Sequence, residues 1–227
     1  MRKAHKIIII FCIANILIAW IYITDLEAGS KQYYETGEVK WDFNYVDGKR
    51  EGITKEYYKN GKLKSEWPYK NGLLNGVTRE YYESGKLKAE WRYKNNKLLD
   101  GWAYYEEGGL KIDYRYINSK REGSTKEYYK SGKLKFDWLY KNDLLNGVTK
   151  GYYESGKLKA EWPYENGKLV DGKIYYESGE LEWDYNFVDG KREGITKGFY
   201  KNGKLKSEWP YKNGLKSEWP YKNGKLF

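Results

Sequence analysis

The fold is decided by the stretch Ile53-Thr54-Lys55-Glu56-Tyr57-Tyr58-Lys59-Asn60-Gly61-Lys62-Leu63-Lys64-Ser65-Glu66-Trp67-Pro68-Tyr69. Its second half alternates strictly, with Leu63, Ser65, Trp67 and Tyr69 on one side and charged residues or proline on the other. Such a period of two predicts a β-strand. The first half is rich in β-forming residues and predicts a second short strand. Because Asn60-Gly61 lies between the two, we expect a β-hairpin.

A two-residue turn at Asn60-Gly61 would set the register of this hairpin. One face would then carry aromatic and apolar pairs, and the other face would carry charged pairs, which stabilise a sheet by about 0.2–1 kcal/mol each. The expected pairs are Tyr58–Leu63 and Thr54–Trp67 on the first face, and Lys55–Glu66 and Tyr57–Lys64 on the second.

The same hairpin sequence returns along the 227-residue chain at an interval of roughly 23 or 24 residues. Its copies begin at Tyr33, Tyr57, Tyr81, Tyr104, Tyr128, Tyr152, Tyr175 and Phe199, and their turn glycines are Gly37, Gly61, Gly85, Gly108, Gly132, Gly156, Gly179 and Gly203. A fixed period of this length is typical of repeat proteins, in which each unit stacks on its neighbours. We therefore expect an all-β fold, an elongated antiparallel meander of roughly 16 strands in a single twisted layer about 75 Å long, preceded by one N-terminal hydrophobic helix.

An aromatic residue occupies the Trp67 position of every copy. The tryptophans at this position are Trp67, Trp91, Trp138, Trp162 and Trp209. We expect these rings to hold the sheet together as a thin aromatic core. The alternative is that the aromatic stripe contacts a ligand or a partner, as an exposed apolar patch of this length would suggest.

A larger period, three repeats long, lies above the short one: Tyr69 to Trp91 reappears almost unchanged as Tyr140 to Trp162. The repeats are expected to span residues 33–214. Residues 215–227 are a duplicated, truncated tail, because 215–224 repeats 205–214 and omits the first strand of a unit. We expect this tail to be poorly ordered or to add one makeshift strand.

The N-terminal segment, residues 1–32, is of a different kind. A basic region, residues 1–6, precedes the apolar stretch 7–23, and residues 24–32 form a linker. This layout is typical of a secretory signal or an uncleaved signal anchor, and the apolar stretch is at the short end for a membrane span. The anchor is the favoured interpretation. Since the basic residues lie on the N-terminal side, the repeats are expected outside the cytoplasm, membrane-anchored, or secreted or periplasmic if the segment is cleaved.

The composition argues against an enzyme. The only histidine is His5 and the only cysteine is Cys12, both before the repeats, which removes histidine and cysteine catalysis and most transition-metal sites from the repeats. We therefore expect no catalytic residues, no metal site and no cofactor. The net charge of +10 with interleaved aromatics could indicate a single-strand nucleic-acid binder. That interpretation is disfavoured because acidic residues share a face with the lysines.

The pattern Tyr-Tyr-x-x-Gly-Lys-Leu-Lys-x-Glu, followed by Tyr-Lys-x-Gly-x-x-x-Gly, resembles the variant MORN repeat of bacterial proteins. Clear copies are residues 57–66 followed by Tyr69-Lys70-Asn71-Gly72 and Gly76. The resemblance covers about residues 33–224. It implies an elongated sheet of β-hairpins that binds other proteins, and some bacterial members, called YwqK-like, are named as antitoxin components of toxin–antitoxin pairs.

Three functional hypotheses remain open. The first is an exported or membrane-anchored scaffold that binds a protein partner along the sheet or its edges, with self-association through those edges as a further option. The second is an antitoxin or immunity component that binds a cognate toxin. The third is a cell-envelope carbohydrate binder that uses the aromatic stripe.

Overall fold

The computed structural model describes residues 30–217, 221–222 and 225–226. The predicted basic region, the hydrophobic segment and most of the linker therefore lie outside the described residues. Within the described part of the chain no helix is long and apolar enough to cross a membrane. The first strand begins at Ser30, inside the segment that the sequence assigned to the linker.

The described chain forms a 22-stranded antiparallel sheet, which confirms the predicted all-β meander. Six of its members are two-residue strands: β7 (Leu73–Leu74), β12 (Lys120–Arg121), β15 (Leu144–Leu145), β18 (Lys168–Leu169), β21 (Lys191–Arg192) and β24 (Leu215–Lys216). The other sixteen follow one another in chain order across the sheet: β1 (Ser30–Tyr33), β2 (Val39–Phe43), β5 (Gly52–Tyr57), β6 (Leu63–Lys70), β8 (Gly76–Tyr81), β9 (Leu87–Lys94), β10 (Lys97–Tyr104), β11 (Leu110–Ile117), β13 (Gly123–Tyr128), β14 (Leu134–Lys141), β16 (Gly147–Tyr152), β17 (Leu158–Glu165), β19 (Asp171–Tyr175), β20 (Leu181–Val188), β22 (Gly194–Phe199) and β23 (Leu205–Lys212).

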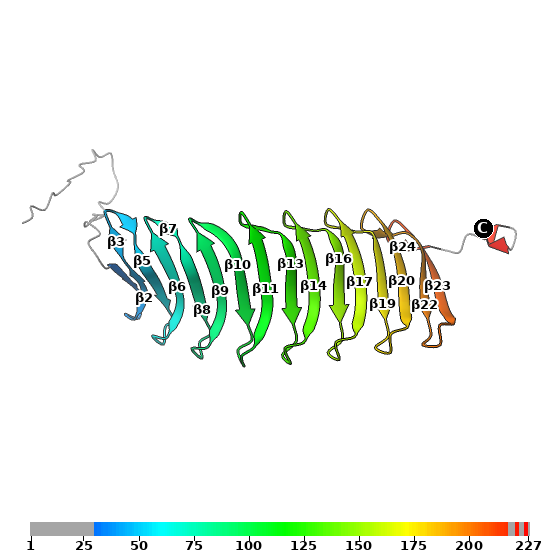
Figure 1. Ribbon diagram of the computed structural model, residues 1–227, viewed down its shortest axis with the longest axis horizontal. Helices are drawn as coiled ribbons and strands as arrows, with labels where there is room; N and C mark the ends of the chain where they lie inside the picture. The colour runs from blue at the N-terminus through cyan, green and yellow to red at the C-terminus, as the bar shows by residue number, and fades with distance from the viewer. Residues whose placement is uncertain (1–29, 218–220, 223–224, 227) are drawn as a thin grey trace, which may run out of the picture.

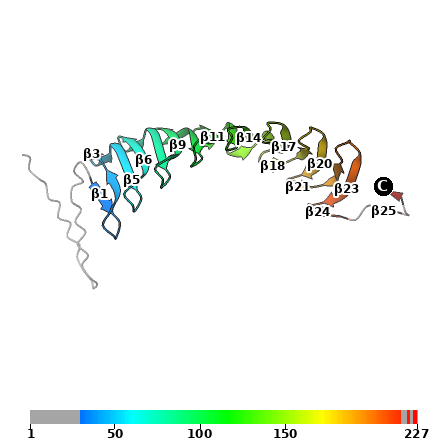
Figure 2. The same cartoon turned by 90° about the horizontal axis from the view of Figure 1, so that it is seen from below.

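Two small sheets accompany the large one. β3 (Tyr45–Val46) pairs with β4 (Lys49–Arg50), and β25 (Tyr221–Lys222) pairs with β26 (Lys225–Leu226). In the predicted tail, β24 adds only a two-residue strand beside β23, as the equivalent short strands do in the other repeats. Figure 1 shows the hairpins side by side in one row, and Figure 2 shows that this row bends along its length. Turns line both long sides of the row, here named the Gly61 edge and the Gly72 edge after one turn glycine of each.

The turn at the Gly61 edge has three residues, so the predicted two-residue turn at Asn60-Gly61 is wrong. The amide of Gly61 donates to the carbonyl of Tyr58, the amide of Tyr58 donates to the carbonyl of Lys62, and Gly61 has φ of 78°. A three-residue loop that ends in a left-handed residue is the second common way to close a hairpin. All eight predicted turn glycines have φ between 76° and 110°.

This longer turn shifts the pairing near it by one residue. Thr54↔Trp67 and Lys55↔Glu66 are paired as predicted. Tyr57, however, pairs with Leu63 and not with Lys64, because a bulge after Glu56 absorbs the extra residue. The bulge compensates for the extra residue of the turn. Farther along the strands, the side chains therefore alternate between the two faces as predicted. The predicted pair Tyr58–Leu63 is likewise replaced, since Tyr58 bonds to Lys62.

The type I′ Asn-Gly turn is found at the other long side. Asn71 and Gly72 have φ of 51° and 79°, and Lys70 pairs with Leu73 across them. Both central residues are left-handed, as a two-residue type I′ hairpin requires. The chain between Lys70 and Leu73 therefore forms a second tight hairpin. These hairpins also stack, since the amide of Gly72 donates to the carbonyl of Arg50 in the preceding repeat at 2.8 Å.

The largest fully buried side chains are threonines and not aromatics. Thr54, Thr78, Thr125, Thr149 and Thr196 are at most 4% exposed, and each belongs to the first strand of its hairpin. They lie on the face that carries Trp67 and its equivalents, which we call the aromatic face. The opposite side, with Lys55 and Glu66, is the charged face. A single sheet has no second layer, so the small threonines are covered by the large rings, while the rings themselves remain half-buried.

Candidate interaction surface

The predicted tryptophan stripe lies on the aromatic face. Trp67, Trp91, Trp138 and Trp162 are half-buried, and Trp209 in the last hairpin is 37% exposed. Neighbouring rings are in contact: Trp91 and Tyr114 have ring centroids 5.2 Å apart, and Phe136 lies 6.2 Å from Trp162. Offset and tilted pairs at these distances are favourable. These contacts support a role in holding the sheet together.

Two glycines allow the rings to lie flat on the sheet. Gly101 and Gly172 occupy the position of the buried threonines and pair with aromatic residues, Trp91 in the case of Gly101. A Cβ atom at Gly101 would lie 2.2 Å from Trp91 Cε3, and one at Gly172 would lie 3.2 Å from Trp162 Cδ1. The close approach of each ring to the backbone therefore requires glycine at Gly101 and favours it at Gly172.

Three arginines recur at the three-repeat period and bridge adjacent repeats on the aromatic face. Arg50, Arg121 and Arg192 each donate from Nη1 to a tyrosine hydroxyl of the next hairpin, and their partners are Tyr69, Tyr140 and Tyr211. The guanidinium carbon of Arg121 lies 5.0 Å from the ring centroid of Tyr140. A guanidinium both stacks on a ring and bonds its hydroxyl, so each arginine ties two repeats together.

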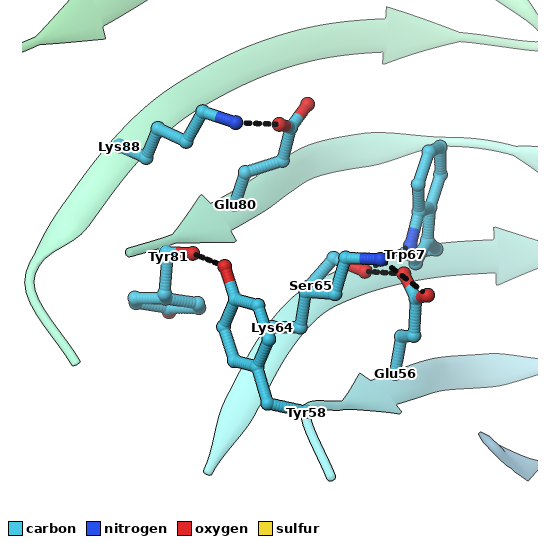
Figure 3. A pocket seen from close by; sticks show the side chains of 8 residues that line it. All are labelled: Glu56, Tyr58, Lys64, Ser65, Trp67, Glu80, Tyr81 and Lys88. Atoms are coloured by element: carbon cyan, nitrogen blue, oxygen red, sulfur yellow. Dashed lines mark hydrogen bonds and ion pairs between the residues drawn. The ribbon is translucent and has the colours of Figure 1, made fainter. Parts of the chain in front are cut away.

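A hollow of about 220 Å³ lies on the aromatic face near Glu56. Figure 3 shows the side chains that line it. Glu56 is 9% exposed and accepts from Lys64 Nζ at 2.8 Å and from the Ser65 hydroxyl at 3.0 Å. The hydrogen bond to Glu56 raises the pKa of Lys64. Lys64 was predicted on the charged face, but the bulge turns it toward Glu56. This acid has its partners within the sheet, so the hollow is explained as a satisfied structural network.

The charged face carries the predicted cross-strand ion pairs. Arg79 and Glu90 are 3.0 Å apart, Lys150 and Glu161 are 3.6 Å apart, and Lys197 and Glu208 are 3.7 Å apart. Their side chains are partly exposed, so each pair contributes at most about 1 kcal/mol. Burial raises the pKa of Tyr175 to about 12, and its 3.0 Å hydrogen bond to Glu161 adds to this effect. Among the described residues no cluster of histidine, cysteine and acidic side chains could hold a metal ion.

The charged face also carries an exposed apolar band along the Gly72 edge, which the sequence analysis did not predict. The exposed fraction of its side chains ranges from 38% to 75%. The members are Val46, Ile53, Leu73, Leu99, Ile117, Leu139, Leu144, Val148, Val188 and Leu215. The three-repeat period contained the signal, because Val46, Ile117 and Val188 occupy equivalent positions. Their exposure became clear only once the second hairpin and its face were known.

Lysines lie directly beside the apolar residues of this band. Val46 pairs with Lys49, Leu73 with Lys70, Ile117 with Lys120, Leu144 with Lys141, Val188 with Lys191 and Leu215 with Lys212. Successive turns are about 10 Å apart, twice the strand spacing. Between Leu99 and Ile117 the band is hollowed, and this hollow of about 560 Å³ is also lined by Asp113, Arg115 and Lys126. The band is therefore an apolar surface with positive charge at regular intervals.

These features define a class: a repeat protein built from stacked β-hairpins, with a long open face on each side. Five segments of the chain match the MORN repeat variant family, namely residues 50–71, 74–95, 121–142, 145–166 and 192–213. These five segments, a little under half of the chain, are thus similar to MORN variant repeats. The intervals between the matches at 96–120 and 167–191 contain Gly101 and Gly172, where glycine replaces the buried threonine. MORN repeats are commonly modules that interact with proteins or membranes.

Two solved structures that match this chain are only distantly similar to it. A GtfA/B complex bound to UDP and GlcNAc is 12% identical with a TM-score of 0.19, over 60% of this chain and 22% of that one. A Photorhabdus luminescens Tc holotoxin pore is 13% identical with a TM-score of 0.21, over 81% of this chain and 13% of that one. The chain thus spans less than a quarter of either. No curated protein sequence matches it.

Proposed function

We propose that this protein is a non-enzymatic scaffold that binds a protein partner along the apolar band of the charged face. The observation that carries the proposal is the band itself, ten exposed aliphatic side chains on one side of a single-layer sheet. Exposed aliphatic side chains that recur along one face in this way are typical of an interaction site. The repeats supply a long, regular surface on which an extended partner could lie.

The chemistry of the band indicates the partner. A surface that fits it would present apolar side chains flanked by carboxylates, since a lysine lies opposite each turn residue of the band. Complementary charge speeds encounter and selects among partners, while the apolar contacts supply most of the affinity. We expect this binding to weaken with salt only moderately, because the apolar contacts supply most of the affinity.

The scaffold is placed outside the cytoplasm in this proposal, with residues 7–23 as its membrane anchor. The support is the N-terminal sequence, where the basic residues Arg2, Lys3 and Lys6 precede an apolar stretch. The partner would then be an envelope protein or the exposed part of another membrane protein.

The test uses the full chain in detergent as bait for proteins of native membranes and cytosol. Replacing Ile117→Glu together with Val188→Glu, equivalent positions of the band in successive three-repeat blocks, is expected to reduce capture at least tenfold. The matched control is Lys86→Glu with Lys157→Glu, which are equivalent to each other in the same way but exposed at the Gly61 edge, and it should leave capture unchanged. Equal capture by both variants would contradict binding through the band.

The two alternatives give different outcomes in the same experiment. A captured protein that arrests growth when expressed alone would identify the chain as an antitoxin component. Retention on envelope stripped of proteins, lost on Trp138→Ala but kept by the band variant, would favour a carbohydrate binder.

A further inference from the structure

The chain contains one strand sequence in two different environments. β6 and β23 have the identical sequence Leu-Lys-Ser-Glu-Trp-Pro-Tyr-Lys. β6 pairs with β5 on one side and with β8 on the other. β23 pairs with β22, and its other side meets only the short β24 among the described residues. In the described part of the chain, the edge of β23 thus lacks the long strand that pairs with the identical edge of β6.

Exposure of the side chains reports the same difference. Leu63 of β6 is half-buried, whereas the equivalent Leu205 is 50% exposed. The Tyr58 hydroxyl donates to the carbonyl of Tyr81 in the next hairpin, whereas Tyr200 is 51% exposed. Tyr200 nonetheless has the orientation of Tyr58, since Lys206 lies over its ring at 5.8 Å as Lys64 does over Tyr58 at 6.0 Å. The donor at this edge is in place but has no acceptor in the described part of the chain.

In the described part of the tail, no strand pairs with β23 as β8 pairs with β6. At interior junctions a second strand is followed by a first-strand sequence such as Gly76-Val77-Thr78-Arg79-Glu80-Tyr81. After β23 the chain instead repeats its second-strand sequence in residues 215–224, so that Pro220 falls where Thr78 would be. Proline lacks the amide that a sheet ladder uses. The described part of the tail folds as its own hairpin, β25 with β26.

The opposite end of the sheet presents a first strand with its outer edge unpaired among the described residues. β1 has the sequence Ser30-Lys31-Gln32-Tyr33, followed by Tyr34, and matches residues 78–82 position by position. β1 pairs only with β2 in the described chain, and Tyr33 is 57% exposed. The two ends of the sheet therefore carry the two halves of an interior junction.

We infer that a second copy of this chain binds head to tail, its β1 adding to β23 in the register of β8 on β6. That register places Glu208 opposite Lys31 of the second copy, as Glu66 lies opposite Arg79. It also brings the Tyr200 hydroxyl to the carbonyl of Tyr33. An acidic residue faces a basic one at the equivalent place in these interior junctions: Asp42↔Lys55, Asp113↔Lys126, Asp137↔Lys150, Glu161↔Lys173 and Asp184↔Lys197.

This contact uses different surfaces on the two partners, so it does not close and extends the sheet into a filament. It adds backbone hydrogen bonds and covers two exposed strand edges, which otherwise favour unspecific pairing. The filament would continue both the aromatic face and the apolar band from one molecule to the next. The inference stands independently of the proposed partner, because it uses the ends of the sheet and not the band.

Disulfide trapping tests the register in the full chain. In a Cys12→Ser background, Lys31→Cys with Glu208→Cys places two thiols at opposite ends of one molecule but across from each other in the assembly, at a separation that a disulfide can span. Under mild oxidation we expect a ladder of dimers, trimers and longer species. The control is Lys31→Cys with Glu66→Cys, since Glu66 belongs to the identical but fully paired strand β6 and should yield at least tenfold less cross-linked product.

A second measurement does not depend on cysteines. Analytical ultracentrifugation of the full chain in detergent should show species larger than the monomer that grow with concentration. Glu208→Lys should weaken this association roughly threefold to fivefold by placing like charges opposite each other, and adding Lys31→Glu should restore it. A monomer at all concentrations, or equal cross-linking of both cysteine pairs, would overturn the inference, whereas loss of partner capture by the band variants would not affect it.

Discussion

The hydroxyl of Tyr58 donates a 2.7 Å hydrogen bond to the backbone carbonyl of Tyr81, which lies one repeat later in the next hairpin. The same bond recurs in the other hairpins, as Tyr34 to Tyr57, Tyr82 to Tyr104, Tyr105 to Tyr128, Tyr129 to Tyr152, Tyr153 to Tyr175 and Tyr176 to Phe199. Neighbouring hairpins share only a short register, Ser65↔Glu80 and Glu66↔Arg79 in this case. The tyrosine ladder therefore supplements the few backbone bonds between repeats at the Gly61 edge.

Removing one rung of this ladder should lower the stability of the sheet. We expect Tyr129→Phe to reduce the free energy of unfolding by about 1 kcal/mol, since it deletes one hydrogen bond and leaves the carbonyl of Tyr152 without this donor. Urea unfolding followed by tryptophan fluorescence measures this change. Tyr200→Phe is the matched control and should cost almost nothing in dilute solution, because no hairpin in the described part of the chain accepts its hydrogen bond. An equal loss in both variants would mean that the ladder contributes no stability.

A methyl group added beneath Trp91 should be poorly tolerated. Gly101→Ala would place its Cβ 2.2 Å from the indole, so the ring or the strand must move. We expect a loss of about 1–3 kcal/mol in the free energy of unfolding, the usual cost of overpacking. Gly172→Ala serves as the comparison, because its Cβ would lie farther from the ring, 3.2 Å from Trp162. Its loss of unfolding free energy should be clearly smaller. The reverse order of the two costs would contradict this account of the glycines.

The bridging arginines should not be replaceable by lysine. Arg121 lies over the ring of Tyr140 and donates to its hydroxyl at 3.0 Å, which a flexible ammonium cannot do in the same geometry. We expect Arg121→Lys to cost about 1 kcal/mol of unfolding free energy. Arg115→Lys, at a partly exposed ion pair 3.6 Å from Asp113, should change it by less than about 0.5 kcal/mol. A similar loss of unfolding free energy in both variants would show that Arg121 stabilises the sheet through its charge alone.

The half-buried tyrosines should make the sheet sensitive to alkali. Burial raises the pKa of Tyr175 to about 12, and burial is also the main cause of the raised pKa of Tyr81, Tyr104 and Tyr128. A tyrosine in the unfolded chain ionises near about pH 10, so the folded state binds more protons above that pH. The stability is therefore complete below about pH 10 and falls as the pH rises toward about 12.

The measurement is the unfolding midpoint as a function of pH, together with the absorbance of tyrosinate. Tyr175→Phe should flatten the loss of stability above about pH 10, because its contribution to the proton difference disappears. A variant in which the exposed Tyr33 is changed to Phe serves as the control and should follow the unchanged protein. Stability that rose with pH in this range would contradict the assignment.

Much of the fold followed from the local pattern of a single repeat. Alternation over Leu63–Tyr69 predicted the strand and its faces, and Lys55↔Glu66 and Thr54↔Trp67 were paired correctly. The turn chemistry was misassigned, because Asn-Gly is compatible both with a type I′ turn and with a three-residue loop that ends in glycine. The sequence contains both, at Asn71-Gly72 and at Lys59-Asn60-Gly61, and only the bonded geometry distinguishes them.

The candidate surface was less predictable than the fold. The tryptophans were placed on the correct face, but whether a ring is covered depends on its neighbours in adjacent hairpins, as Trp91 shows over Gly101. The apolar band was not predicted because its members, such as Val46 and Leu73, are separated in sequence by charged turns. They come together only when each second hairpin folds beside the next.

By itself the sequence determined the repeat, its period, the strands and the separation of an aromatic from a charged face, because these depend on alternation within a single repeat. Tertiary structure alone decided which residues are buried, where the bulges lie and which edges lack a partner among the described residues. The reason is that a one-layer sheet has no second layer to form a core. Whether a side chain is buried, as Thr54 is, or exposed, as Ile117 is, therefore depends on the two neighbouring hairpins. At the ends of the row, β1 and β23 each have one neighbouring hairpin fewer among the described residues, so Leu205 of β23 is exposed although β23 has the same sequence as the interior strand β6.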